Sequence, residues 1–285
     1  MHMQRQKVQR NSYRSSLNFL ILRWMLMNDG SSQLPLQRLT KEGSSIQKEA
    51  IVEETAIQLD ALNPEGNLYS HATLLATPID LIELHAGHIL AEGYVSCDLA
   101  IESFVHKQTP HHVIEYQGIL EVRPRDRIVT SSCGACNHPD LLVQEVKGNI
   151  ESKFFTNLDL DFVNDALNSL TKSMELFHKS GGSHGSGLFI HDEGLRYVSE
   201  DIGRHNAVDK TIGKAALDGH TDFNASMLLL SGRCGWDIVA KAIRTGIPAI
   251  SSLGAFSSAA IKLAREHGLI LYGFVKNEGA WKAGH

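Results

Sequence analysis

Two cysteines, Cys133 and Cys136, are separated by two residues in the segment VTSSCGACNHPD, among small and polar residues. This C-x-x-C spacing serves zinc binding, disulfide exchange and the transfer of sulfur as a persulfide. Zinc needs further ligands, and no second C-x-x-C supplies them. A redox pair usually stands at the start of a helix, whereas Pro139 favours a loop here. An exposed, bendable thiol suits a persulfide carrier, and two incidental cysteines are the structural alternative.

A zinc-dependent deaminase would place an H-x-E triplet before a P-C-x-x-C motif. In this chain the H-x-E triplet that begins at His191 follows the cysteines, and no proline precedes Cys133. We therefore predict no structural metal, and a zinc-dependent hydrolase is the least favoured of the three interpretations.

Two loops rich in glycine and serine stand between strand-like and helix-like segments. They are SGRCG at residues 231–235 and SLGAFSS at residues 252–258. Glycine lets the backbone approach a ligand closely, and Arg233 adds a planar guanidinium suited to phosphate. Ser231, Gly232 and Arg233 are therefore candidate anion-binding residues, with ordinary turn formation and helix capping as the alternative.

A third glycine-rich segment, SGGSHGSGLF, places Gly182 and His184 ahead of a strand-like run. No lysine follows it as in a nucleotide P-loop, and the segment lacks the G-x-G-x-x-G spacing. We interpret it as a wall of a binding site that is lined by backbone.

Charged and polar side chains gather in the segment SEDIGRHNAVDKTIGKAAL, around a predicted helix with Asn206 as its N-cap. One interpretation gives binding or proton-transfer roles to Arg204, His205 or Asp209. In the other, these charges, with that of Lys210, simply pair with one another.

The elements that must position these residues are clearest in the second half of the chain. Apolar runs of strand length at residues 227–231, 247–253 and 269–275 alternate with helical periodicity that closes on Gly246 and Gly268. This pattern predicts a β-α-β-α-β unit whose three parallel strands are buried on both faces. Ligands bind at the carboxyl ends of such strands, so the two serine-containing loops should lie at the binding edge.

The first half is less regular. Its pattern predicts a strand at residues 56–62, a turn at NPEGN, and a helix at residues 78–93 capped by Thr77. Residues 31–45 are polar and contain glycine and serine, which indicates a linker. The folded part should then begin near Ile46.

Bulk properties exclude several classes of protein. The 285 residues carry a formal net charge of -5, so no basic excess exists to bind nucleic acid generally. Four cysteines are too few for a disulfide scaffold of this length, which favours a reducing compartment. An apolar run at residues 17–27 is interrupted by Arg23 and is too short to span a bilayer. We expect a poorly ordered leader there, with an interfacial amphipathic helix or a targeting signal as alternatives.

Six segments stand in this order along the chain: TPIDLIELHAGHILAEG, SSCGAC, SGGSHGSGLF, EDIGRHNAVDK, LLLSGR and GIPAISSLGAFSSAAIKLAREHGLILYGFV. Together they resemble the FdhD family of formate dehydrogenase accessory sulfurtransferases, and the likeness runs from Ile51 to Lys276. EDIGRHNAVDK is highly specific.

The resemblance implies a cytoplasmic, homodimeric sulfur carrier. Such a carrier accepts sulfur from a cysteine desulfurase and delivers it to the bis(molybdopterin guanine dinucleotide) molybdenum cofactor, its substrate, before that cofactor enters formate dehydrogenase. Cys133 would bear the persulfide and Cys136 would be a helper or resolving thiol. A chaperone that only binds and protects the cofactor is the alternative, and in it the cysteines would be dispensable.

The resemblance also implies an α/β fold. We expect a leader and linker at residues 1–45, an α+β domain at 46–150 that ends in the cysteine loop, and a cytidine-deaminase-like three-layer α/β/α domain at 151–285. From the resemblance and the segments above, the candidate cofactor-binding residues are Gly182, His184, Arg204, His205, Asn206, Asp209, Lys210, Ser231, Gly232, Arg233, Phe274, Val275, Lys276, Asn277, Glu278 and Gly279.

Several positions depart from the family pattern. Asn137 stands where a glycine usually follows the second cysteine, and CGWD follows SGR where a small residue, a serine and an acidic residue are common. GAFSS replaces a turn that usually contains proline, and the segment KNEGAWKAGH lacks the usual arginine and tyrosine. These departures bear more on the cofactor contacts than on the cysteine loop.

Overall fold

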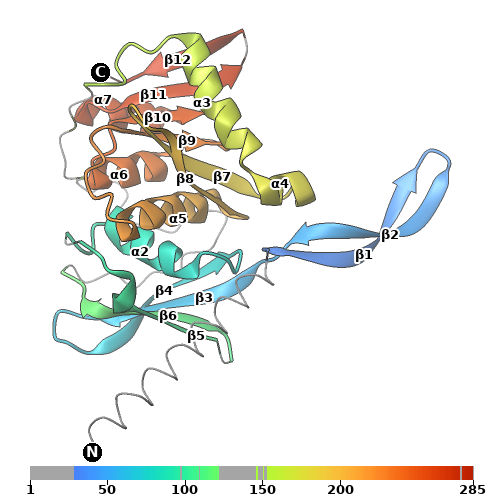
Figure 1. The fold of residues 1–285 in the computed structure, drawn as a ribbon, viewed down its shortest axis with the longest axis horizontal. Helices are drawn as coiled ribbons and strands as arrows, with labels where there is room; N and C mark the ends of the chain where they lie inside the picture. The colour runs from blue at the N-terminus through green and yellow to red at the C-terminus, as the bar shows by residue number, and fades with distance from the viewer. Residues whose placement is uncertain are drawn as a thin grey trace, which may run out of the picture.

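The structure is a computed structural model that describes residues 29–96, 98–108, 110–121, 146, 150, 153–276 and 278–284. Within these residues the strands form three sheets of two, four and six strands. Figure 1 shows the six-stranded sheet with its helices at one end of the molecule and the four-stranded sheet at the other. The mixed α/β class predicted from the sequence is confirmed.

The two-stranded sheet is a hairpin that projects away from the body of the molecule (Figure 1). It consists of β1 (Ser31–Thr40) and β2 (Gly43–Val52), which pair antiparallel along their whole length. The prediction of a linker at residues 31–45 is therefore wrong. Most residues of the hairpin are exposed on both faces, so its sequence lacks the alternation that marks a half-buried strand.

The four-stranded sheet has the order β4-β3-β6-β5. The predicted strand at residues 56–62 is confirmed as β3, and NPEGN forms the turn to β4. Only the β3–β6 pair is parallel. The bounds of its elements are β3 (Thr55–Leu62), β4 (Leu68–Ala76), a 3-10 turn (Ile101–Ser103), β5 (Phe104–Lys107) and β6 (His112–Ile119).

Helix α2 (Leu81–Ala91) covers this sheet and starts three residues later than predicted. Its N-cap is Asp80, in the left-handed region with φ 51°, and Thr77 does not cap it. Instead, the Thr77 hydroxyl accepts a hydrogen bond from the Ile202 backbone N–H at 3.0 Å. Thr77 therefore ties the two halves of the chain together, a role that local sequence cannot reveal.

The six-stranded sheet has the order β12-β11-β10-β9-β7-β8 and contains the predicted β-α-β-α-β unit. Strands β9, β10 and β11 are parallel, and Gly246 and Gly268 end the two intervening helices in the left-handed conformation. The elements are α3 (Leu160–Lys172), α4 (Glu175–Ser180), β7 (His184–Ile190), β8 (Gly194–Asp201), α5 (Arg204–Leu217), β9 (Ser226–Leu230), α6 (Trp236–Thr245), β10 (Ala249–Ser252), α7 (Ser258–His267), β11 (Ile270–Lys276) and β12 (Gly279–Ala283).

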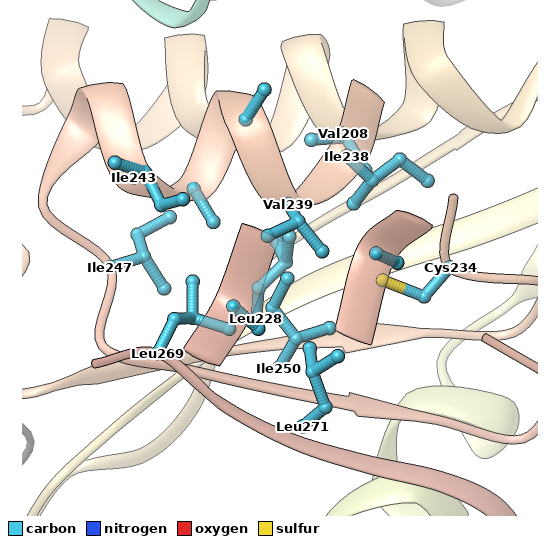
Figure 2. Close-up of a cluster of buried hydrophobic side chains, with 14 of the residues drawn as sticks. Val208, Leu228, Cys234, Ile238, Val239, Ile243, Ile247, Ile250, Leu269 and Leu271 are labelled. Atoms are coloured by element: carbon cyan, nitrogen blue, oxygen red, sulfur yellow. The ribbon is translucent and has the colours of Figure 1, made fainter. Parts of the chain in front are cut away.

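Helices pack on both faces of this sheet. On one face α5, α6 and α7 contribute Val208, Ile238 and Leu263 to one apolar cluster, part of which Figure 2 shows. On the other face α3 contributes Leu167 to a second cluster with Leu229. The predicted domain limit at residue 150 falls in a region where few residues are described.

The two halves of the chain meet where α2 packs against α5 (Figure 1). Gly87 and Gly213 allow this close approach. A Cβ on Gly87 would lie 1.7 Å from the Asp209 carbonyl oxygen, and one on Gly213 would lie 1.9 Å from the Glu83 carbonyl oxygen. The backbones of the two helices therefore touch, which no larger residue at either position would permit.

Candidate functional site

The two loops that follow β9 and β10 lie at one edge of the six-stranded sheet and contact each other, as predicted. The Cys234 N–H donates to the Ala255 carbonyl at 2.9 Å, and the Ser252 hydroxyl donates to the Gly232 carbonyl at 2.5 Å. A Cβ on Gly254 would lie 2.7 Å from that same carbonyl oxygen. Glycine is therefore required where the loops meet, and Arg233 is exposed at this edge.

His184, at the start of β7, comes within contact of the first loop. A Cβ on Gly232 would lie 3.0 Å from His184 Nδ1, and the Ser231 hydroxyl accepts from the Gly185 N–H at 2.8 Å. The structure thus brings the glycine-rich segment before β7 together with the loop after β9. These segments lie more than forty residues apart in the sequence.

Four side chains with cationic or potentially cationic groups gather here, and we call them the cation cluster: His184, Arg204, His205 and Arg233. Burial lowers the pKa of His184, and the charges of the other three members lower it further. Arg204 Nε is buried and has no hydrogen-bond partner among the described residues. A group of cations with an unsatisfied donor, beside a serine hydroxyl, is suited to an anion such as phosphate.

One acidic residue that sequence analysis did not select faces this cluster. Asp237, in the first turn of α6, forms an ion pair with His205, in the first turn of α5. Burial by itself raises the pKa of Asp237, but His205 and Arg204 outweigh that effect and lower it overall. The only sequence signal was its place shortly after the SGR motif.

Cys234, in the loop after β9, is a buried thiol. Its side chain packs into the apolar cluster among Ile238 and Ile250 (Figure 2) and is 1% exposed. Burial raises the pKa of the Cys234 thiol, and the nearby Asp237 carboxylate raises it further. Cys133 and Cys136 lie outside the described residues, so their predicted roles stay predictions.

Three candidate residues lie away from the cluster, inside the α2–α5 junction. Helix α5 starts at Arg204 with Gly203 as its N-cap, so the predicted N-cap role of Asn206 is wrong. Asn206 is buried within the helix and donates to the Leu75 carbonyl at 2.8 Å and to the Asp201 carboxylate at 3.0 Å. Its amide thus satisfies a backbone carbonyl near the end of β4, in the other half of the chain.

Lys210 and Asp209 are also engaged in ion pairs within the protein. The Lys210 ammonium pairs with the Asp201 carboxylate at 2.6 Å, with both side chains fully buried. Asp209 pairs with Lys241 at 2.8 Å, and Lys241 pairs in turn with Glu92 of the N-terminal half at 2.7 Å. Lys210 thus pairs within the segment, as in its alternative interpretation, whereas Asp209 pairs with a lysine outside the segment.

The segment after β11 forms a separate surface next to the second loop. The Phe274 N–H donates to the Gly254 carbonyl at 2.9 Å, and the Phe274 ring packs edge-on against Phe256. A groove of about 670 Å³ follows the strand end, and it is lined by Phe274, Lys276, Glu278, Gly279, Ala280 and Trp281. Val275 points into the core instead, and Asn277 lies outside the described residues.

Gly182 lies apart from both surfaces. It is exposed just before β7, and a Cβ there would lie 3.1 Å from Val52 at the end of the projecting hairpin. The structure therefore groups the candidates into the cation cluster, the groove and the buried junction. The cation cluster and the groove share the carboxyl edge of the parallel strands.

Comparison with known proteins assigns the chain to a family. The model of the FdhD/NarQ family matches residues 52–281. The chain belongs to the FdhD/NarQ family. A sulfur carrier protein FdhD of Thermoplasma acidophilum is 34% identical over 239 residues, which cover 80% of this chain and 83% of that protein. One of Streptomyces coelicolor is 31% identical over 220 residues, which cover 72% of this chain and 78% of that protein.

The fold has a solved counterpart. A protein of Desulfotalea psychrophila, described as a formate dehydrogenase accessory protein, superposes with a TM-score of 0.67. The match covers 90% of this chain and 97% of that one, at 24% sequence identity, and so bears on the fold alone. Among the described residues, no helix is both long and apolar enough to cross a membrane, and no group of three or more ligating side chains is arranged to hold a metal.

Proposed function

We propose that this chain is a persulfide carrier that supplies sulfur to the bis(molybdopterin guanine dinucleotide) molybdenum cofactor, which it binds as a substrate. The sulfur comes from a cysteine desulfurase, and the sulfurated cofactor is destined for formate dehydrogenase. The observation that carries this proposal is a C-x-x-C pair in a chain whose relatives are named sulfur carrier proteins.

The chemistry of loading is transpersulfidation. The Cys133 thiolate attacks the outer sulfur of the donor persulfide, a new S–S bond forms, and the donor cysteine leaves as its thiolate. The carrier then holds Cys133–S–SH, and no external oxidant or reductant is consumed. Cys136 is the helper thiol that can resolve the persulfide. The buried Cys234, whose pKa is raised, cannot take the role of Cys133.

The cation cluster and the groove are the surfaces that we assign to the cofactor. The cofactor carries phosphates and guanine bases. The cluster offers Arg204 and Arg233 to the phosphates, and the groove offers the half-exposed Phe274 ring to an aromatic base. Asn206, Asp209 and Lys210 are left out of this assignment because their side chains are buried and paired.

The test is mass spectrometry of the full chain after incubation with a cysteine desulfurase and cysteine. We expect the wild-type chain to gain one sulfur atom on Cys133, and Cys133→Ala to lose the adduct and fail to activate formate dehydrogenase. Cys136→Ala should have a milder defect. Cys234→Ala is the matched control, because it removes an unreactive thiol and should leave labelling intact.

Two outcomes would count against the carrier. If Cys133→Ala activates formate dehydrogenase normally, the chain is a cofactor-binding chaperone for which the cysteines are dispensable. If both loop variants lose activity equally, a required dithiol replaces the single persulfide. We further propose a cytoplasmic homodimer, which light scattering of the purified chain would test for oligomeric state.

A further inference from the structure

Asp237 lies beside the cation cluster, and both oxygens of its carboxylate have partners. One carboxylate oxygen, Oδ2, contacts His205 Nε2, and the other, Oδ1, accepts from the Ile238 N–H at 3.0 Å. A Cβ on Gly235 would lie 2.5 Å from Oδ1, so the absence of a side chain at that position lets the carboxylate fold back. The side chain is thus held between a backbone donor, a glycine and an imidazole.

His205 needs such a partner because of its surroundings. Arg204 precedes it on α5, and His184, at the start of β7, interacts electrostatically with Arg204, His205 and Arg233. The members of this cluster are cationic or can become so. The other nearby carboxylate, Asp201, is already engaged by Lys210 at 2.6 Å. Asp237 is therefore the carboxylate that contacts the cluster, through His205.

The contact also sets the direction of the ring. An imidazole has two nitrogens, and the partner of one determines the tautomer and the aim of the other. With Nε2 held by Asp237, Nδ1 is left for a second partner. The His205 side chain is 13% exposed.

We propose that Asp237 is a positioning residue that orients His205, so that the cation cluster binds a phosphate-bearing ligand with the help of this imidazole. This inference rests on the proposed function, because it concerns the same surface that receives the guanine nucleotide ends of the cofactor. It adds to that surface a residue that acts on the ligand through His205.

The experiment measures GDP affinity by calorimetry at pH 7 for the full-length chain and its variants. We expect Asp237→Asn to bind GDP more weakly than the wild type, because its amide no longer holds His205 in place. Asp237→Glu keeps the charge and should restore most of the affinity.

His205→Gln supplies the baseline, because it removes the imidazole while leaving Asp237 in place. Its GDP affinity should be about as low as that of Asp237→Asn, and adding Asp237→Asn to it should change nothing further. A purely structural role for Asp237 predicts that Asp237→Asn weakens binding equally with and without His205. Equal GDP affinity in wild type and Asp237→Asn, or no GDP binding by the wild type, would overturn the proposal.

The outcome is separable from that of the proposed function. Persulfide labelling of Cys133 needs no nucleotide, so the carrier proposal can hold while the Asp237 proposal fails. Conversely, GDP binding that depends on Asp237 through His205, without any labelling of Cys133, would support the role of Asp237 in a chaperone.

Discussion

Acidification should destabilise the fold through two buried imidazoles, His71 of β4 and His85 of α2. Their Nε2 atoms lie 2.8 Å apart, so one ring donates to the other, which requires both to be neutral or the pair to share one added proton. His88 stacks on His71, and Tyr94 and Phe104 complete the surroundings. Protonation would place charge in this apolar region.

The size of the loss in stability follows from the pKa shift of one ring, that of His71. Burial, reinforced by His88, lowers the pKa of His71 from 6.5 to about 3. Between these values the unfolded chain binds the proton and the folded chain does not, so stability is full above pH 6.5 and falls as the pH drops. At pH 4.5, two units below the unfolded value, His71 alone should cost about 3 kcal/mol. Burial shifts the pKa of His85 in the same direction, which adds to the loss.

The assay is urea unfolding at pH 7 and pH 4.5 for wild type and for the double variant His71→Leu/His85→Leu. Replacing both partners by apolar groups of similar size should change stability little at pH 7 and remove much of the acid sensitivity. His178→Leu, at an exposed position, is the control for background titration. Equal losses in wild type and double variant between the two pH values would refute the reasoning.

Two further predictions concern the junction of the two halves. Gly87→Ala should force α2 away from α5 and cost about 3 kcal/mol in thermal or urea unfolding, whereas Gly279→Ala, where a Cβ meets nothing, should be neutral. Lys210→Met should cost about 3–5 kcal/mol because it leaves the Asp201 carboxylate buried without its cation. Adding Asp201→Asn should recover part of that loss, and an additive loss in the double variant would contradict the pairing.

Local signals predicted the second half of the chain well. The strands and helices from β9 to β11 are short, their apolar runs are continuous, and glycines end both helices. Such features depend on neighbours in the sequence, so they can be read without the tertiary structure. The same pattern placed the loops after β9 and β10 at one edge, which the structure confirms.

Local signals failed where a partner lies far away in the chain. The hairpin of β1 and β2 resembled a linker because its residues are exposed on both faces. Asn206 resembled an N-cap, yet its amide hydrogen bonds to Leu75, 131 residues earlier. Asp237 drew no attention because its partner His205 belongs to a different helix.

The sequence by itself determined the family, through motifs spread along most of the chain, the parallel unit and the edge at which the loops after β9 and β10 meet. It also singled out the C-x-x-C pair as the chemistry of interest. Only the tertiary structure decided which polar residues of EDIGRHNAVDK face that edge and which are buried. The physical reason is that Lys210 and Asp209 find their counter-charges in space, on Asp201 and Lys241, and a buried charge is stable only with such a partner.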